Sequence, residues 1–166
     1  GLPAAIGAQL AFPNSNVICI TGDASFQMNI QELGTIAQYN LPIKILILNN
    51  RWQGMVRQWQ QSFYDERYSH SSMKDGMPDF VKLAESYGIK GCRVKTPEEF
   101  AAIENDIVST NQAMLIDFEV NETENCYPMV APGKSNSQMI GLNAESSVMH
   151  KLGDRSDRYI PGQYGQ

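Results

Sequence analysis

Long apolar runs are missing from this chain of 166 residues. A membrane-spanning helix needs roughly 20 consecutive apolar residues, and no stretch approaches that length, so we expect no membrane partner. Basic residues are also scarce, because 13 Lys and Arg stand against 18 Asp and Glu and no segment concentrates them. This balance argues against nucleic acid as a partner and favours small-molecule chemistry.

The three cysteines are not arranged in a recognisable motif. Cys19, Cys92 and Cys126 form no CxxC pattern and no cluster with histidine. We expect all three to be reduced residues in or near the core, which indicates a reducing compartment. The two histidines, His70 and His150, are interpreted as polar loop residues rather than acid–base groups.

An initiator methionine and a secretory leader are absent from the opening residues, GLPAAIGAQLAFP. Because the chain opens directly on a helix-like segment, we expect upstream sequence to have been removed. The length suits one domain. We expect an N-terminally truncated α/β domain at 1–125, followed by an irregular C-terminal arm or tail at 126–166, where the alternation of strands and helices stops.

Strand-like and helix-like patterns alternate along the first part of the chain. Short apolar runs are typical of parallel strands buried on both faces. They occur at 17–20, 43–48 and 113–120, and a more mixed strand-like run occurs at 89–94. Apolar residues at helical spacing occur between them, at 2–12, 26–40, 79–87 and 97–109. These patterns predict an α/β fold: an open, mostly parallel sheet with helices on both faces.

The segment from Arg51 to Pro78 is rich in aromatic and polar residues and fits neither pattern. Long irregular loops in compact domains are usually functional. We therefore interpret this segment, and the arm from about Cys126, as candidate lids over a binding site.

Polar side chains follow the first two predicted strands. Asp23 comes directly after the first strand, and the Asn49-Asn50 pair follows the second. Parallel α/β sheets bind ligands beyond the carboxyl ends of their strands, and the carboxylate of Asp23 and the amide of Asn50 offer the hard oxygen ligands that Mg²⁺ prefers. A helix starting after Ala24 would favour a diphosphate beside the metal. Taken singly, each motif also fits an ordinary turn with a helix cap.

Together, the two motifs resemble the thiamine-diphosphate signature of decarboxylases and carboligases, which has GD at one end and NN at the other. Longer stretches, including GLPAAIGAQLA, GDASFQMN, LNNRWQGMVRQWQ and ENCYPMVAPG, resemble the catalytic subunit of acetohydroxyacid synthase, also called acetolactate synthase, in its C-terminal thiamine-diphosphate-binding domain. The resemblance runs from Gly1 to about Leu142, is nearest to cyanobacterial and algal plastid forms, and leaves residues from Asn143 onward unplaced.

The resemblance implies a metal and cofactor site. It assigns Asp23 and Asn50 as side-chain ligands of Mg²⁺, with the backbone carbonyl of Trp52 as a further ligand. It assigns thiamine diphosphate to a pocket formed by Gly22, Asp23, Ala24, Ser25, Asn50, Gly54 and Met55. Position 24 is alanine where many members of the superfamily have glycine, which matters little because the backbone is the donor.

Trp59 is implied to face the substrate channel, where this family favours a larger second 2-keto acid and where its herbicides bind. The alternative is an ordinary aromatic anchor of the loop.

The implied activity is that of a thiamine-diphosphate-dependent transferase. It decarboxylates pyruvate and ligates the two-carbon unit to pyruvate or 2-ketobutyrate, which yields 2-acetolactate or 2-aceto-2-hydroxybutyrate for branched-chain amino-acid biosynthesis. The activating glutamate is expected in a pyrimidine-binding domain, and FAD in a middle domain, neither of which is in this chain. We therefore expect no catalytic residue here and no activity of the chain alone.

The resemblance further implies a homo-oligomer, a dimer or tetramer, with a possible regulatory subunit, in bacterial cytoplasm or plastid stroma. Two alternative hypotheses for the function are not excluded. The chain could belong to another thiamine-diphosphate carboligase, decarboxylase or oxidase, or it could be a non-catalytic module that binds a magnesium diphosphate.

Overall fold

The computed structural model describes residues 1–141. The chain divides into two compact units, Gly1–Asn125 and Cys126–Gln166, which are described separately. His150 and the unplaced residues from Asn143 onward lie outside the described part. Within that part, no helix has the length and apolar character needed to cross a bilayer.

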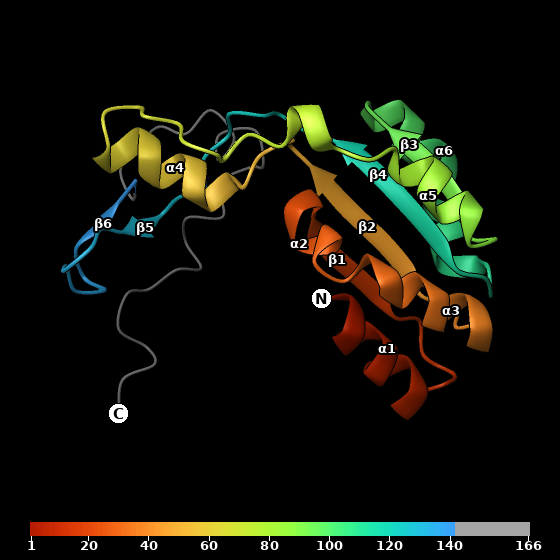
Figure 1. Ribbon diagram of the computed structural model, residues 1–166. Coiled ribbons are helices and arrows are strands. Elements are labelled where there is room, and N and C mark those ends of the chain that lie inside the picture. The colour runs from red at the N-terminus through yellow and green to blue at the C-terminus, as the bar shows by residue number, and fades with distance from the viewer. Residues whose placement is uncertain (142–166) are drawn as a thin grey trace, which may run out of the picture. The chain divides into compact units, whose positions relative to one another are not determined.

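A four-stranded parallel sheet forms the centre of the first unit (Figure 1). Its strands are β1 (Ile18–Gly22), β2 (Lys44–Asn49), β3 (Lys90–Val94) and β4 (Met114–Glu119), in the spatial order β1-β2-β4-β3. The predicted fold class is confirmed. The strand β4, the last of these four in the sequence, lies between β2 and β3, so β2 and β4 are the central strands.

Helices cover both faces of the sheet. The helices α1 (Leu2–Ala11), α2 (Asp23–Gln27), α3 (Leu33–Tyr39) and α5 (Phe80–Ser86) contribute to the larger core, and α6 (Pro97–Ser109) contributes to the smaller one. In the larger core, the Phe26 and Phe80 rings meet edge to face at 5.5 Å over the buried side chains of Ile45 and Ile47. In the smaller core, Ile107 packs with Met114 and Ile116 of β4.

Local signals in the sequence set the ends of the later helices. Thr96 accepts a hydrogen bond from the Glu99 N–H at 3.2 Å and caps α6, as the sequence predicts. The Asp79 side chain caps α5 by accepting hydrogen bonds from the N–H groups of the first turn. Gly88 follows α5 with φ of +72°, the left-handed conformation that ends many helices.

Three expectations are corrected. The predicted helix at 26–40 is divided into α2, the 3₁₀ turn η1 (Ile30–Glu32) and α3, because Asn29 has a non-helical backbone with φ of −138°. Cys126 is exposed, whereas Cys19 is buried and Cys92 is half-buried, so the expectation of a core position is wrong for Cys126.

The third correction concerns the predicted loop from Arg51 to Pro78. It contains the helix α4 (Gly54–Phe63) and the 3₁₀ turn η2 (Lys74–Gly76). The helix was missed although Met55, Trp59 and Phe63 recur at the four-residue steps of a helix, because the aromatic and polar content of the segment was interpreted as that of a loop.

Close contact between α5 and β3 depends on Gly91. A Cβ at this position would lie 2.9 Å from the Val81 carbonyl oxygen and 3.1 Å from the Val81 Cα, so the α5 backbone would have to move. We expect Gly91→Ala to lower the free energy of unfolding by about 1–3 kcal/mol. Hydrogen exchange of the β3 amides measures this loss. Gly7→Ala is the matched control, because nothing lies within 4 Å of its added Cβ; equal behaviour of the two variants would contradict the prediction.

The described part of the second unit, residues 126–141, contains a two-stranded antiparallel ribbon. Its strands are β5 (Met129–Val130) and β6 (Met139–Ile140), and Met129 pairs with Ile140. The sequence predicted an irregular arm from residue 126 onward, and its described residues contain this ribbon.

Candidate functional site

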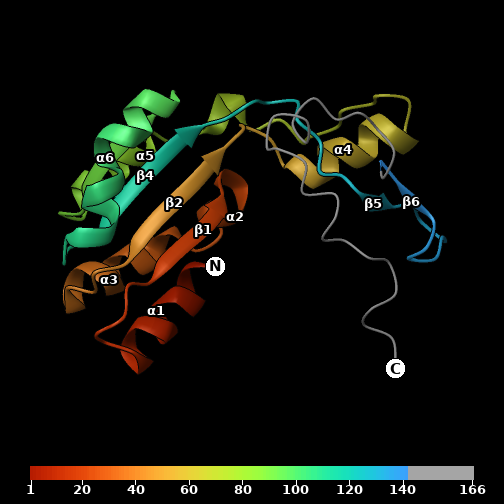
Figure 2. The ribbon, with the colours of Figure 1, turned by 180° about the vertical axis from the view of Figure 1, so that it is seen from behind.

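The carboxyl ends of β1 and β2 bring the two polar motifs to one edge of the sheet. The strands are parallel neighbours, and Gly22 pairs with Leu48 in their register. Asp23 and Asn50 therefore both lie just beyond the last residues that pair β1 with β2. Figure 2 shows the edge where the chain leaves β2 and β4.

The Asp23 carboxylate links the two motifs directly. Its side chain is only 1% exposed. One oxygen, Oδ1, accepts a hydrogen bond from the Ala24 N–H at 2.8 Å, and Oδ2 accepts one from the Arg51 N–H at 2.7 Å. Arg51 has φ of 62°, so the turn after β2 is bent into the left-handed region at the point where it meets Asp23.

The Asp23 carboxylate is buried, and its pKa is shifted. Burial raises the pKa of the Asp23 carboxyl above its ordinary value; the N–H groups of Ala24 and Arg51 oppose this shift, and the negative charge of Asp117 adds to it. Among the residues that the structure describes, no lysine, arginine or histidine forms an ion pair with Asp23. A buried, ionised carboxylate in this setting is stabilised by a bound cation.

Asn50 begins a compact turn that leads into α4. Its Oδ1 accepts a hydrogen bond from the Trp52 N–H at 3.1 Å. A Cβ on Gly54 would lie 3.1 Å from the Asn50 Nδ2, so glycine at the first residue of α4 leaves room for the amide. The turn thus places an amide oxygen and the backbone of Trp52 close to the Asp23 contact with Arg51.

Asn49, the other half of the asparagine pair, has a different role. It is buried, and its Nδ2 donates a hydrogen bond to Asp117 Oδ1 at 2.9 Å. Asp117 Oδ2 accepts a hydrogen bond from Arg93 Nε at 3.0 Å, and Arg93 Nη2 reaches Asp79 Oδ1 at 3.0 Å. This network, from β2 through β4 and β3 to the cap of α5, was missed by sequence reasoning; the signal was an aspartate within the apolar run of β4.

The remaining predicted site residues lie in two places. Gly22, Ala24 and Ser25 surround Asp23 at the junction of β1 and α2. Met55 and Trp59 lie on α4.

The side chains on α4 differ in exposure. Met55 is 50% exposed, and Trp59 is half-buried with its ring edge to face with Phe63 at 5.5 Å. His70, expected to be a polar loop residue, is exposed in the loop after α4.

A metal ion at the carboxyl edge of the sheet would be bound by oxygen atoms from both side chains and the backbone. Within residues 1–141, no group of three or more His, Cys, Asp or Glu side chains could hold a metal ion. The donor set is one carboxylate, one amide and backbone carbonyls, which fits a Mg²⁺ ion that keeps its other positions for phosphate oxygens and water.

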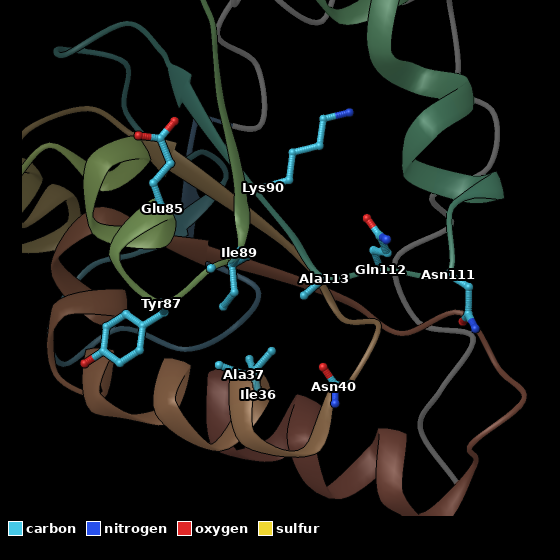
Figure 3. A pocket seen from close by; sticks show the side chains of 11 residues that line it. Ile36, Ala37, Asn40, Glu85, Tyr87, Ile89, Lys90, Asn111, Gln112 and Ala113 are labelled. Carbon is cyan, nitrogen blue, oxygen red and sulfur yellow. The ribbon is translucent and has the colours of Figure 1, made fainter.

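A cavity of ≈ 570 Å³ lies elsewhere in the first unit (Figure 3). It is lined by Asn40, Ile89 and Ala113, among others, which precede or begin strands β2, β3 and β4. It is therefore at the amino-terminal edge of the sheet and contains none of the predicted site residues.

Comparison with known protein families shows which family the chain belongs to. Residues 1–118 match the family described as thiamine pyrophosphate enzyme, C-terminal TPP binding domain. This chain belongs to that family.

Individual relatives within this family are acetolactate synthase large subunits. The chain is 66% identical to the acetolactate synthase large subunit of Cyanidium caldarium over 87% of this chain and 25% of the relative, and 47% identical to the acetolactate synthase isozyme 2 large subunit of Escherichia coli over 84% and 25%. The chain thus spans about a quarter of the length of these relatives. The resemblance to acetolactate synthase indicated by the sequence is confirmed.

A solved structure is also similar. The thiamine diphosphate-dependent 4-hydroxybenzoylformate decarboxylase of Rhodococcus jostii RHA1 matches with a TM-score of 0.68 and 37% identity, over 74% of this chain and 23% of that one. The family match and this structure both relate the chain to the thiamine-diphosphate-binding part of such enzymes.

Proposed function

We propose that this chain is the diphosphate- and magnesium-binding portion of an acetohydroxyacid synthase catalytic subunit. The complete polypeptide would decarboxylate pyruvate and ligate the two-carbon unit to a second 2-keto acid, pyruvate or 2-ketobutyrate. The observation that carries the proposal is the buried Asp23 carboxylate, which accepts a hydrogen bond from the Arg51 N–H in the turn after β2. Identity to acetolactate synthase large subunits supports the choice of reaction.

The residues of this chain have binding and orienting roles in the proposal. Asp23, Asn50 and the Trp52 carbonyl would hold Mg²⁺, and Gly22, Ala24 and Ser25 would receive the diphosphate at the start of α2. Gly54 and Met55 would lie against the cofactor. Thiamine diphosphate, when bound, supplies the carbon nucleophile of the reaction.

Other parts of the enzyme are proposed outside this chain. The glutamate that activates the cofactor and the FAD site would lie in other domains, so we expect the chain alone to be inactive. We further propose a homo-oligomer, with a possible regulatory subunit, in bacterial cytoplasm or plastid stroma.

The experiment that tests the function is product analysis of the complete polypeptide. With thiamine diphosphate, Mg²⁺ and pyruvate it should form 2-acetolactate, and with added 2-ketobutyrate also 2-aceto-2-hydroxybutyrate. The same assay on the 166-residue chain should give no product.

The open alternatives give other outcomes of this assay. Decarboxylation of 2-keto acids without either acetohydroxy acid would indicate another thiamine-diphosphate enzyme. Cofactor binding without turnover of the complete polypeptide would indicate a non-catalytic binding module.

Trp59 is expected to control the choice of the second substrate. Its half-buried ring lies on α4, four residues after Met55, so both side chains share one face of the helix. We expect Trp59→Leu to shift the product ratio towards 2-acetolactate about 10-fold, with little change in cofactor affinity, because a smaller side chain contacts the larger substrate less well. Competition of pyruvate and 2-ketobutyrate measures this ratio.

Phe63→Leu is the control, because it removes the aromatic partner of Trp59 and keeps the indole. Equal product ratios in the two variants, or equal effects on substrate choice and cofactor affinity, would favour the alternative in which Trp59 only anchors its loop.

A further inference from the structure

Arg57 is a buried cation on α4 that the proposed mechanism does not use. Its side chain is 6% exposed. In the part of the chain that the structure describes, it forms no ion pair with an aspartate or glutamate, and its Nε has no hydrogen-bond partner. Burying a guanidinium is costly unless other groups replace the lost water, so its actual contacts indicate what the residue does.

Two aromatic rings contact the guanidinium. The Cζ of Arg57 lies 5.5 Å from the centroid of the Trp52 ring and 5.3 Å from that of Tyr68. The two rings also meet each other edge to face at 5.7 Å. Cation–π contacts of this kind favour arginine, whose flat guanidinium can lie against a ring while its N–H groups donate hydrogen bonds.

Neutral oxygens receive the hydrogen bonds of Nη1. It donates to Gln61 Oε1 at 3.3 Å, to the Thr123 carbonyl at 3.4 Å and to Asn125 Oδ1 at 3.3 Å. Asn125 in turn donates to Gln61 at 2.9 Å. Arg57 therefore joins α4 to the turn after β2, to the loop that carries Tyr68, and to the segment after β4.

The turn that contains Trp52 is held on its other side by the same loop. The Gln53 N–H donates to the Ser71 carbonyl at 2.9 Å, and the Met73 N–H donates to the Arg51 carbonyl at 2.9 Å. These bonds enclose an isolated antiparallel bridge between Trp52 and Ser72. The backbone of Trp52 is thus fixed by the bridge, while its ring is fixed by Arg57 and Tyr68.

We infer that Arg57 is a positioning residue for the metal and substrate ends of the site. By packing against the Trp52 ring it stabilises the bridged turn that holds the Trp52 backbone carbonyl, and by bonding to the segment after β4 it sets the position of α4, which carries Met55 and Trp59. This inference rests on the proposed function, in which the Trp52 carbonyl is a Mg²⁺ ligand and Trp59 faces the substrate. Lysine keeps the charge but cannot make the paired ring and hydrogen-bond contacts.

The test compares Arg57→Lys and Arg57→Met with Arg67→Lys in the complete polypeptide. Arg67 is the matched control, because it is an exposed arginine in the neighbouring loop. For Arg57→Lys we expect the Mg²⁺ concentration for half-maximal cofactor retention to rise about 10-fold, which corresponds to the loss of one such contact. The product ratio should shift towards 2-acetolactate, and the amides of Gln53 and Met73 should exchange faster while the β2 and β4 amides do not change.

The outcomes separate the inference from the proposed function. If Gln53 and Met73 exchange faster but the Mg²⁺ dependence and the product ratio do not change, Arg57 makes a purely structural contact and the inference is overturned. Wild-type behaviour of Arg57→Lys in every measurement would also overturn it. If the wild-type polypeptide makes no acetohydroxy acid, the proposed function fails, and Mg²⁺-dependent cofactor retention still decides the role of Arg57. If Arg57→Met does not fold, Arg57→Lys with intact β2 and β4 protection supplies the result.

Discussion

Replacement of Asp23 by alanine in the complete polypeptide is expected to abolish the Mg²⁺-dependent retention of thiamine diphosphate. Asp23 is the buried carboxylate at the candidate site, and no cationic side chain of the described residues pairs with it. Without it, only the Asn50 amide and backbone oxygens would be left to hold the ion. We expect the apparent Mg²⁺ affinity to fall by more than about 100-fold.

Gel filtration followed by cofactor assay measures this retention, at several Mg²⁺ concentrations. The alanine variant also leaves the N–H groups of Ala24 and Arg51 without their acceptor, so hydrogen exchange of β1 and β2 must show that the sheet is intact. Glu104→Ala, which removes an exposed carboxylate on α6, is the control and should retain the cofactor. Unchanged retention in Asp23→Ala would refute the ligand role.

Asp117→Ala is expected to cause the largest loss of stability. The side chain of Asp117 is 1% exposed and accepts hydrogen bonds from Asn49 and Arg93. Its removal leaves the buried Asn49 amide without this acceptor and removes the buried carboxylate that pairs with Arg93. Losses of about 2–4 kcal/mol are typical when one partner of such a network is deleted.

Hydrogen exchange in β2 and β4 reports this loss without requiring the complete polypeptide to unfold as one unit. Their amides should exchange about 30- to 1,000-fold faster. Asp117→Asn keeps the shape and one acceptor oxygen, so it should give an intermediate effect. The Glu104→Ala control should not change exchange. A loss below about 1 kcal/mol would mean that the pairing energy is largely offset by desolvation.

Local signals account for the parts of the fold that were predicted well. The apolar runs that became β2 and β4 indicate strands well, because these central strands are buried on both faces over most of their length, whereas the edge strands β1 and β3 are partly exposed. Thr96 and Gly88 mark helix ends through contacts within a few residues. Such contacts depend on nearby residues in the chain, so a sequence pattern indicates them.

Long-range contacts account for what was missed. Sequence reasoning grouped Asn49 and Asn50 as one pair. Consecutive residues at the end of a strand point to opposite sides. Asn49 can bond to Asp117 only because β4 lies beside β2. The contacts of α4 were missed as well, because its buried Arg57 donates a hydrogen bond to the carbonyl of Thr123, which is distant in the sequence.

Sequence patterns alone indicate the alternation of strands and helices, the placement of Asp23 and Asn50 beyond adjacent strand ends, and the resemblance to thiamine-diphosphate enzymes. The tertiary structure decided which polar groups share which partners: Asp23 with the Arg51 backbone, Asn49 with Asp117, and Arg57 with the Trp52 and Tyr68 rings. The physical reason is that hydrophobic periodicity is a local property of the chain, whereas a buried polar group is satisfied by partners that only the order and register of the strands bring within hydrogen-bonding distance.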